Sequence, residues 1–382
     1  MDKAALAMLV AGLLLVTLAF VTPQPKSGAP SVAVETRAAQ PEVEGRLLIY
    51  VNGELKYSGK VHSFLKPAPT FLAVGFFSTS SFRYAGASFY TEKPSAWIPT
   101  SSAGSVSDIT VRYGGYQSSN SVWGTVTSIA PLLLVYDTTG NKWAEISLST
   151  TPSIFYNSTG VLLSVSGSVT PSLSAAANVS MIRFVRPTFV YSGGNSPYYA
   201  VRMAEDTLPS PVTINPGDSL AVVYQFYFKA DQIFTANWAN AFFAWLYNVP
   251  AAKINVTATD GTTDYIDPTA SAYNNPANNA PVNGYIVLGN GQATFSRTAY
   301  RVVSEVARAE PSVQVYGGGV SLSYAFTFSQ DTTITELAVY AKLRDGKEVM
   351  LLYYVLPQPT VAKAGVPFTV TFKINLPYAD RV

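Results

Sequence analysis

Apolar and polar residues alternate in short runs along most of the chain after its first 44 residues. Successive side chains of a β-strand point to opposite faces, so this alternation predicts strands that are buried on one face. Residues 71–77, FLAVGFF, are apolar throughout, which predicts a strand buried on both faces. Asn52-Gly53 between two runs is a strong hairpin signal. The clearest run covers residues 219–228, with its apolar positions at Leu220, Val222, Tyr224, Phe226 and Phe228.

One order of strands recurs along the chain. In residues 334–376, two strands joined by a charged turn are followed by a proline, a glycine and a long alternating strand. Residues 129–170 repeat this order, and residues 208–228 repeat its closing part. We therefore predict a mainly β fold with two antiparallel β-sandwich domains, of jelly-roll or immunoglobulin-like type, over residues 45–230 and 251–382.

A short amphipathic helix is predicted to connect these domains over residues 231–250. Asp231 is a suitable N-cap, and Pro250 ends the segment. Aromatic residues recur at helical spacing and form the candidate assembly face: Phe234, Trp238, Phe242 and Trp245. This face packs on a core, on a neighbouring subunit or in a membrane interface. The absence of Lys and Arg argues against the membrane.

An uncharged apolar segment opens the chain. Residues 4–21 would span about 27 Å as a helix, close to the thickness of the bilayer core. We predict a signal-anchor or transmembrane helix over residues 1–21, with a cleaved signal peptide as the open alternative. Residues 22–44 are predicted to be an extended linker. Within it, residues 31–37 alternate, so Val32 and Val34 belong to a strand donated to a neighbour's sheet or to a strand of their own domain, and a flexible stalk is the third interpretation.

The amino-acid composition limits the kinds of catalytic and binding sites that this chain can form. The 382 residues are 48% hydrophobic and 13% charged, with a net charge of +2 and no cysteine. His62 is the single histidine, so zinc hydrolase and Ser-His-Asp mechanisms are improbable. The sequence has no cluster of Lys and Arg of the kind that binds nucleic acid. No pair of Asp or Glu residues is indicated as a general acid and a general base. We predict no catalytic residues, no cofactor and no nucleic-acid partner.

Two kinds of candidate site remain. Asp260, Asp264 and Asp267 lie within eight residues and are candidate calcium ligands, although their spacing is not that of an EF-hand loop. Three glycosylation triplets begin at Asn157, Asn178 and Asn255.

The closing strands of the chain share one pattern of residues: Ile334, Glu336, Leu337, Ala338, Tyr340, Lys363, Gly365 and Val370. With this pattern they resemble modules of virion appendages and tail fibres. Tail fibres are made in the cytoplasm, whereas this chain opens with an apolar segment. The resemblance therefore implies an exported structural protein of an archaeal virus or an archaeal surface filament.

The predicted function is a structural subunit of a virion surface or an extracellular filament that assembles with copies of itself. The alternative is a membrane-anchored cell-surface protein that binds glycans or mediates attachment to host surface glycans. A secreted hydrolase is a third class, and it requires a cleft with two close carboxylates. In the first two classes the protein is extracellular or on a virion surface, either anchored through its N-terminal helix or secreted.

Overall fold

A computed structural model describes residues 43–61, 64–65, 67–77, 82–92, 104–111, 132–149, 153–157, 159–189, 198–229, 233–247, 254–266, 279, 281–316 and 318–376. The predicted membrane segment, the predicted donor strand with Val32 and Val34, and His62 lie outside these residues. Within them, no helix is both long enough and apolar enough to cross a membrane.

The described chain is mainly β, as predicted, and its strands form antiparallel sheets with two short helices. The strands of the first half are β1 (Val43–Val51), β2 (Glu54–Val61), β3 (Phe82–Glu92), β4 (Gly104–Val111), β5 (Leu132–Tyr136), β6 (Lys142–Ser147), β7 (Ser153–Asn157), β8 (Gly160–Val169), β9 (Ala177–Phe189), β10 (Tyr198–Ile214) and β11 (Leu220–Lys229). Those of the second half are β12 (Ile254–Thr257), β13 (Thr263–Ile266), β14 (Pro281–Gly289), β15 (Glu305–Ala309), β16 (Ser312–Tyr316), β17 (Gly319–Phe326), β18 (Thr332–Leu343), β19 (Glu348–Ala362) and β20 (Phe368–Asn375). The helices are α2 (Pro67–Phe76) and α4 (Ala236–Tyr247).

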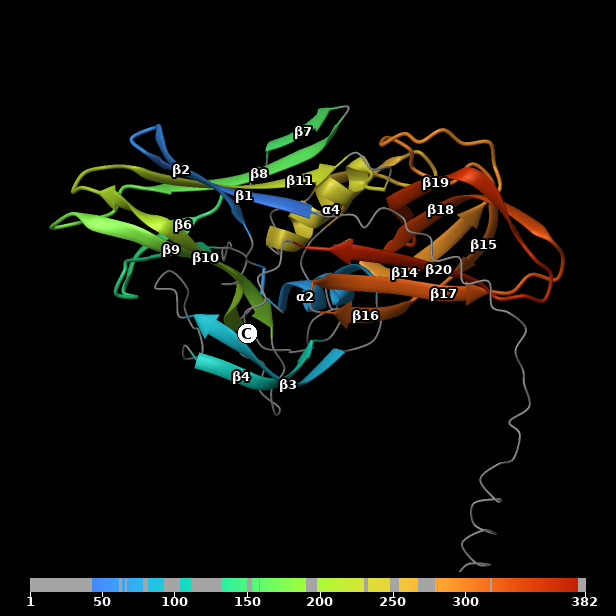
Figure 1. The fold of residues 1–382 in the computed structure, drawn as a ribbon, viewed down its shortest axis with the longest axis horizontal. Helices are drawn as coiled ribbons and strands as arrows, with labels where there is room; N and C mark the ends of the chain where they lie inside the picture. The colour runs from blue at the N-terminus through green and yellow to red at the C-terminus, as the bar shows by residue number, and fades with distance from the viewer. Residues whose placement is uncertain are drawn as a thin grey trace, which may run out of the picture.

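Each half of the described chain contains two larger sheets. In the first half, the sheet β2-β1-β11-β8-β7 lies over the sheet β4-β3-β10-β9-β5-β6 (Figure 1). Tyr224 of β11 reaches the second sheet, where its hydroxyl donates a 2.7 Å hydrogen bond to the buried carboxylate of Asp206 in β10. In the second half, β15-β14-β18-β19 and β16-β17-β20 form the corresponding pair, and β12-β13 is a separate hairpin.

Local turn chemistry behaves as predicted. Asn52 and Gly53 adopt φ angles of 51° and 80°, the left-handed values that a type I′ hairpin turn requires. The hairpin joins β1 to β2, and β1 begins at Val43, two residues before the predicted start of the domain. The predicted alternation in β11 is also confirmed, because its even-numbered residues from Leu220 to Phe228 are buried.

The recurring order of strands has one architecture in both halves. β5 and β6 form a hairpin in one sheet, and the chain then crosses to β8 in the facing sheet. β18 and β19 likewise form a hairpin before the chain crosses to β20. The copies differ in one element, because β7 precedes β8, whereas only a turn precedes β20. β7 is therefore an addition to the shared unit.

The strand predicted over residues 71–77 is wrong, because residues 71–76 belong to α2 and Phe77 follows in a turn. Two prolines stand in the first turn, Pro67 and Pro69, where a helix tolerates a missing N–H. The helix packs against β10 of the first half and β14, β16 and β17 of the second. Because it is buried on several sides, its apolar run has no polar face, and such a run has the same appearance in a buried strand and in a buried helix.

The predicted connecting helix is confirmed as α4, which begins later than expected. Thr235 caps it, since its Oγ1 accepts a 3.2 Å hydrogen bond from the N–H of Trp238. Phe234, Trp238 and Phe242 are 3%, 0% and 0% exposed, so the expectation that they contact a neighbouring subunit is corrected: they lie in the core. The side chain of Trp245 lies outside the described residues.

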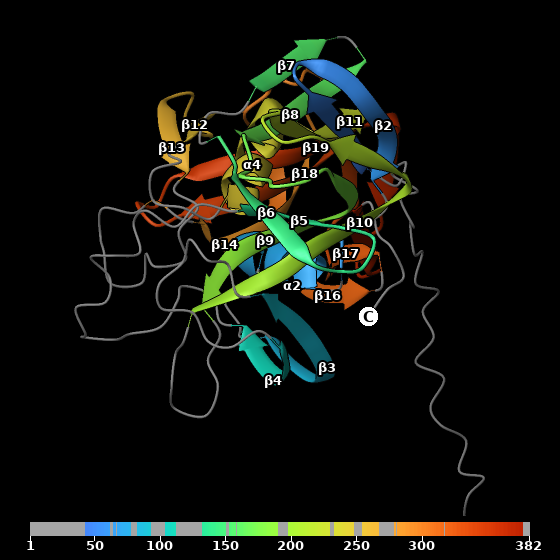
Figure 2. The same ribbon diagram turned by 90° about the vertical axis from the view of Figure 1, so that its left-hand side faces the viewer.

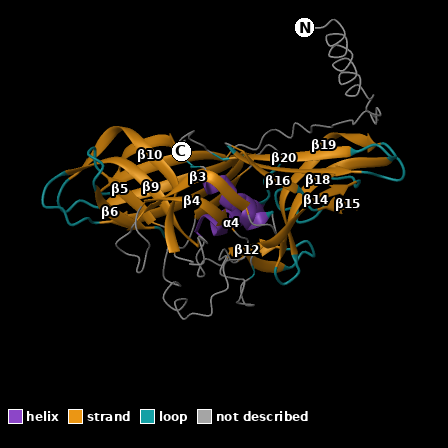
Figure 3. Ribbon diagram, turned by 90° about the horizontal axis from the view of Figure 1, so that it is seen from below, coloured by secondary structure: helices purple, strands orange, loops and turns teal. Residues whose placement is uncertain are grey.

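Both helices lie between the two pairs of sheets (Figure 3). Most of the buried apolar side chains in the described residues form one large cluster that runs from Val43 in β1 through both helices to Leu376 after β20, and two smaller clusters lie beside it. The division into two domains at residues 231–250 stays a prediction, and the described core is continuous through that segment.

Candidate functional site

The residues that carry the resemblance have structural partners. Glu336 is fully buried in β18, and its carboxylate accepts hydrogen bonds from the N–H groups of Gly291 and Val303, at 3.1 and 3.0 Å, and from the Tyr353 hydroxyl, at 2.7 Å. The Tyr340 hydroxyl accepts a 2.7 Å bond from the N–H of Val302. Both side chains therefore hold the segment that joins β14 to β15.

The turn between β19 and β20 contains two more residues of the same pattern, Lys363 and Gly365. Lys363 forms a 2.7 Å ion pair with Asp331. Gly365 has a φ of 71° and donates a 2.9 Å hydrogen bond to the Phe328 carbonyl. These contacts show that residues of the pattern stabilise the fold, and the spacing of the residues in the sequence did not predict the contacts.

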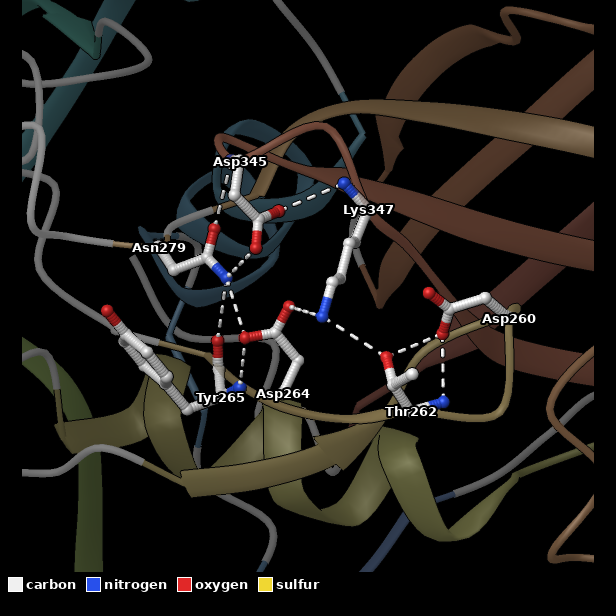
Figure 4. A network of polar contacts seen from close by, with 7 residues as sticks. All are labelled: Asp260, Thr262, Asp264, Tyr265, Asn279, Asp345 and Lys347. Atoms are coloured by element: carbon white, nitrogen blue, oxygen red, sulfur yellow. Dashed lines mark hydrogen bonds and ion pairs between the residues drawn. The ribbon is translucent and has the colours of Figure 1, made fainter.

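A polar network surrounds the candidate calcium ligands (Figure 4). The Asn279 amide donates to Asp264 and Asp345, at 3.1 and 3.0 Å. The Lys347 ammonium lies 3.5 Å from the second carboxylate oxygen of Asp264 and donates to the Thr262 hydroxyl at 3.1 Å. The network joins the β12-β13 hairpin to the turn between β18 and β19.

The same geometry does not favour calcium among the described residues. Asp260 accepts hydrogen bonds from the N–H and the hydroxyl of Thr262, at 2.8 and 2.6 Å, and stands apart from Asp264 at the turn. Nowhere in the described residues do three His, Cys, Asp or Glu side chains converge to hold a metal ion. Lys347 already supplies a positive charge beside Asp264. Asp267 lies outside the described residues, so the calcium site stays a prediction.

The Asp345 carboxyl gives this network a pH dependence. Burial, followed by the neighbouring Asp264 carboxyl, raises the pKa of Asp345 above its ordinary value. A raised folded-state pKa stabilises the fold below the ordinary pKa, and this contribution is lost as the pH rises through the raised value. We expect Asp345→Asn to remove that loss, so the variant gains stability relative to the parent from acid to neutral pH. The gain should be less than about 1 kcal/mol, because solvent screens the site.

Asp218→Asn is the matched control for urea unfolding measured across this pH range. Hydrogen bonds from the Asn215 N–H and the Asn52 amide lower the pKa of Asp218. Its stabilising contribution is present above the ordinary pKa and is lost as the pH falls, so this variant should change the pH slope in the opposite direction. Equal slopes for the two variants would contradict the assignment.

The three predicted glycosylation positions are all exposed. Asn157 ends β7, Asn178 lies in β9 and Asn255 lies in β12. The Asn157 side-chain oxygen accepts hydrogen bonds from Thr159 and Gly160, which closes the turn to β8. Their exposure is compatible with glycosylation, which stays a prediction.

β7 is the least buried of the strands whose side chains the structure describes. Phe155 and Tyr156 are 60% and 43% exposed, and no residue of β7 is charged. The strand stands at the edge of its sheet, clear of the core (Figure 2). Its position at an edge depends on the tertiary structure, and no pattern in the sequence predicts it.

Two contacts from other elements support β7. Arg297, from the segment between β14 and β15, donates hydrogen bonds to the carbonyls of Asn157 and Gly160 at the β7-β8 turn. The Tyr156 hydroxyl donates to the Asn240 side chain of α4 at 3.4 Å. The exposed strand is therefore held in place by α4 and by the segment between β14 and β15.

Comparisons with protein-family models, with curated proteins and with solved structures found no match. The function is therefore inferred from the surfaces and contacts of the described residues. Among them, β7 is the feature that the packing of the core does not account for.

Proposed function

We propose that this chain is a structural subunit of a virion surface or an extracellular filament, and that it associates with copies of itself through β-rich faces. The observation that supports this is the uncharged edge strand β7, with Phe155 and Tyr156 exposed. An exposed strand edge presents unpaired backbone groups, and sheets extend readily by adding a strand there. Self-association accounts for such an edge on a β-rich fold.

The proposal includes two finer statements. The two pairs of sheets correspond to two β-sandwich domains of jelly-roll or immunoglobulin-like type, which is supported by the shared strand order in both halves. Residues 31–37 add a strand to a neighbouring subunit, and residues 1–21 anchor the protein in a membrane or direct its export. We propose no catalytic role.

The alternative, a receptor for surface glycans, would gather exposed aromatic side chains in one groove. In the described residues, the large exposed apolar side chains are instead spread over several elements: Leu55 in β2, Phe155 and Tyr156 in β7, Val303 before β15, Tyr324 in β17 and Val361 in β19. This distribution supports assembly over glycan binding.

Deleting residues 22–42 tests the strand donation. The deletion stops before Val43, because that residue is buried in β1 and pairs with Phe228. We expect folded subunits with an unchanged circular dichroism spectrum that no longer form polymers in negative-stain micrographs. Deleting residues 22–30 alone keeps the alternating segment and is expected to preserve assembly. Normal polymers from the longer deletion would rule out strand donation.

A further inference from the structure

The two edges of the β2-β1-β11-β8-β7 sheet differ in their protection. β2 carries Glu54, Lys56 and Lys60, and charges on an edge strand oppose pairing with another chain. β7 reads Ser-Ile-Phe-Tyr-Asn and has neither a charge nor a proline. Its edge therefore lacks the features by which β proteins prevent association.

Most other edge strands in the described sheets are protected in the same way as β2. β6, β15 and β20 carry charged residues, and β19 contains two prolines. β12 and β16 lack both, but the backbone of β12 is hydrogen-bonded by Asn237 and Asn240 of α4. The exposed side chains of β16 are polar, namely Ser312 and Gln314. β7 alone among these strands combines an unprotected edge with exposed aromatic residues.

Among the described strands, β7 pairs on one side alone, with β8. The carbonyl of Ser166 in β8 accepts a hydrogen bond from the N–H of Ser149, so it points away from β11 and toward the side of β7. Backbone groups point to alternate sides along a strand, so those of Leu162 also point toward β7, where Leu162 stands opposite Phe155. The N–H and C=O groups of Phe155 therefore face β8, and those of Ile154 and Tyr156 point outward from the sheet.

We propose that β7 pairs antiparallel with β7 of a second copy of this chain, about a two-fold axis at Phe155. This contact rests on the proposed self-assembly and identifies one of its interfaces. The register centred on Phe155 pairs all five residues of each strand. It places Ile154 opposite Tyr156 of the second copy, so the outward backbone groups bond to each other. The two sheets become one sheet across the interface.

Charge and side-chain order support a second copy as the occupant. A two-fold contact brings each residue near its own equivalent, so an uncharged strand pairs without like-charge repulsion. The outer face continues an apolar row, since Phe155 is opposite Leu162, and Leu162 is opposite Tyr227. The two Phe155 rings meet at the centre of this row. Asn157 faces Ser153 of the second copy, so a sugar there would stand beside the pair.

A pair of five-residue strands buries less than a stable dimer interface needs, which is roughly 1,200 Å² or more. The contact is therefore weak in isolated subunits. In a polymer, a second contact on each subunit raises the effective concentration of the strands and stabilises the pairing.

The absence of cysteine allows a direct test. In the proposed register the Phe155 residues form a pair without backbone hydrogen bonds, with Cα atoms about 4.5 Å apart, within the range that a disulfide bridges. We expect Phe155→Cys in the full chain to give disulfide-linked dimers under mild oxidation, seen by non-reducing electrophoresis of assembled material. Most chains should be linked.

Two matched variants control for random collision. Leu55→Cys places a thiol on the β2 edge, where Leu55 is 48% exposed, and is expected to remain monomeric. Tyr156→Cys shifts the thiol by one residue, opposite Ile154 of the second copy, and is also expected to remain monomeric. Circular dichroism verifies that each variant is folded. Equal cross-linking of all three variants, or none at Phe155→Cys, overturns the pairing.

Mixed samples identify other occupants of the edge. If Phe155→Cys chains link to Val34→Cys chains and not to one another, the donated segment occupies β7, and the two-fold pairing is wrong. Polymers without a Phe155→Cys cross-link overturn this contact and leave the proposed function standing. Cross-linked dimers without any polymer support the contact and overturn the structural-subunit proposal.

Discussion

Replacing Trp238 by alanine is expected to lower the free energy of unfolding by about 3–5 kcal/mol, as large-to-small changes in cores do. Trp238 is fully buried in α4, and its ring centroid lies 5.3 Å from that of Phe234 and 6.0 Å from that of Phe242. Phe76 of α2 and Phe228 of β11 pack on its other sides. Alanine leaves a cavity where both helices meet the sheet, so we expect a loss of cooperativity between the halves as well. Urea unfolding followed by far-UV circular dichroism measures the effect without depending on tryptophan fluorescence.

Trp238→Phe is the matched control. The indole N–H has no hydrogen-bond partner among the described residues, so phenylalanine removes an unsatisfied buried donor together with part of the ring. The two effects oppose each other, and we expect a loss of less than about 2 kcal/mol. Similar unfolding midpoints for the alanine and phenylalanine variants would show that ring packing at this position contributes little.

Replacing Glu336 by alanine is expected to destabilise the fold by at least about 3 kcal/mol, because three donors lose a buried acceptor and each costs roughly 1–3 kcal/mol. Those donors are Gly291, Val303 and Tyr353. The effect should be local as well as global, because the carboxylate holds the segment between β14 and β15 onto β18. Hydrogen exchange measured by mass spectrometry should show faster exchange in residues 290–304.

Glu305→Gln controls for the loss of a negative charge in the same region. Glu305 pairs with Arg308 at a half-exposed position of β15, where ion pairs contribute less than about 1 kcal/mol. We expect a small change in unfolding free energy and unchanged exchange in residues 290–304. Unchanged exchange in the Glu336→Ala variant would contradict the anchoring role of this carboxylate.

The alternating strand β11 and the turn between β1 and β2 follow from neighbouring residues, and both were predicted. The alternation in β11 and the positive φ angles at Asn52 and Gly53 depend on side-chain direction and backbone sterics, which act within a few residues. The contacts of the candidate sites were harder to predict from the sequence. Glu336 was recognised in a pattern, but its partners Gly291 and Val303 are more than thirty residues away in sequence.

The sequence by itself determined the β class, the hairpin turns, the connecting helix and the order of strands that both halves share, because propensity, period and turn chemistry are local. Only the tertiary structure decided that the apolar residues 71–76 are helical, since burial on several sides removes the period that distinguishes helix from strand. It also decided that Trp238 lies in the core, while Phe155 lies on an open sheet edge. Whether an aromatic side chain is buried or exposed depends on which distant strands pack against it, and no local pattern contains that information.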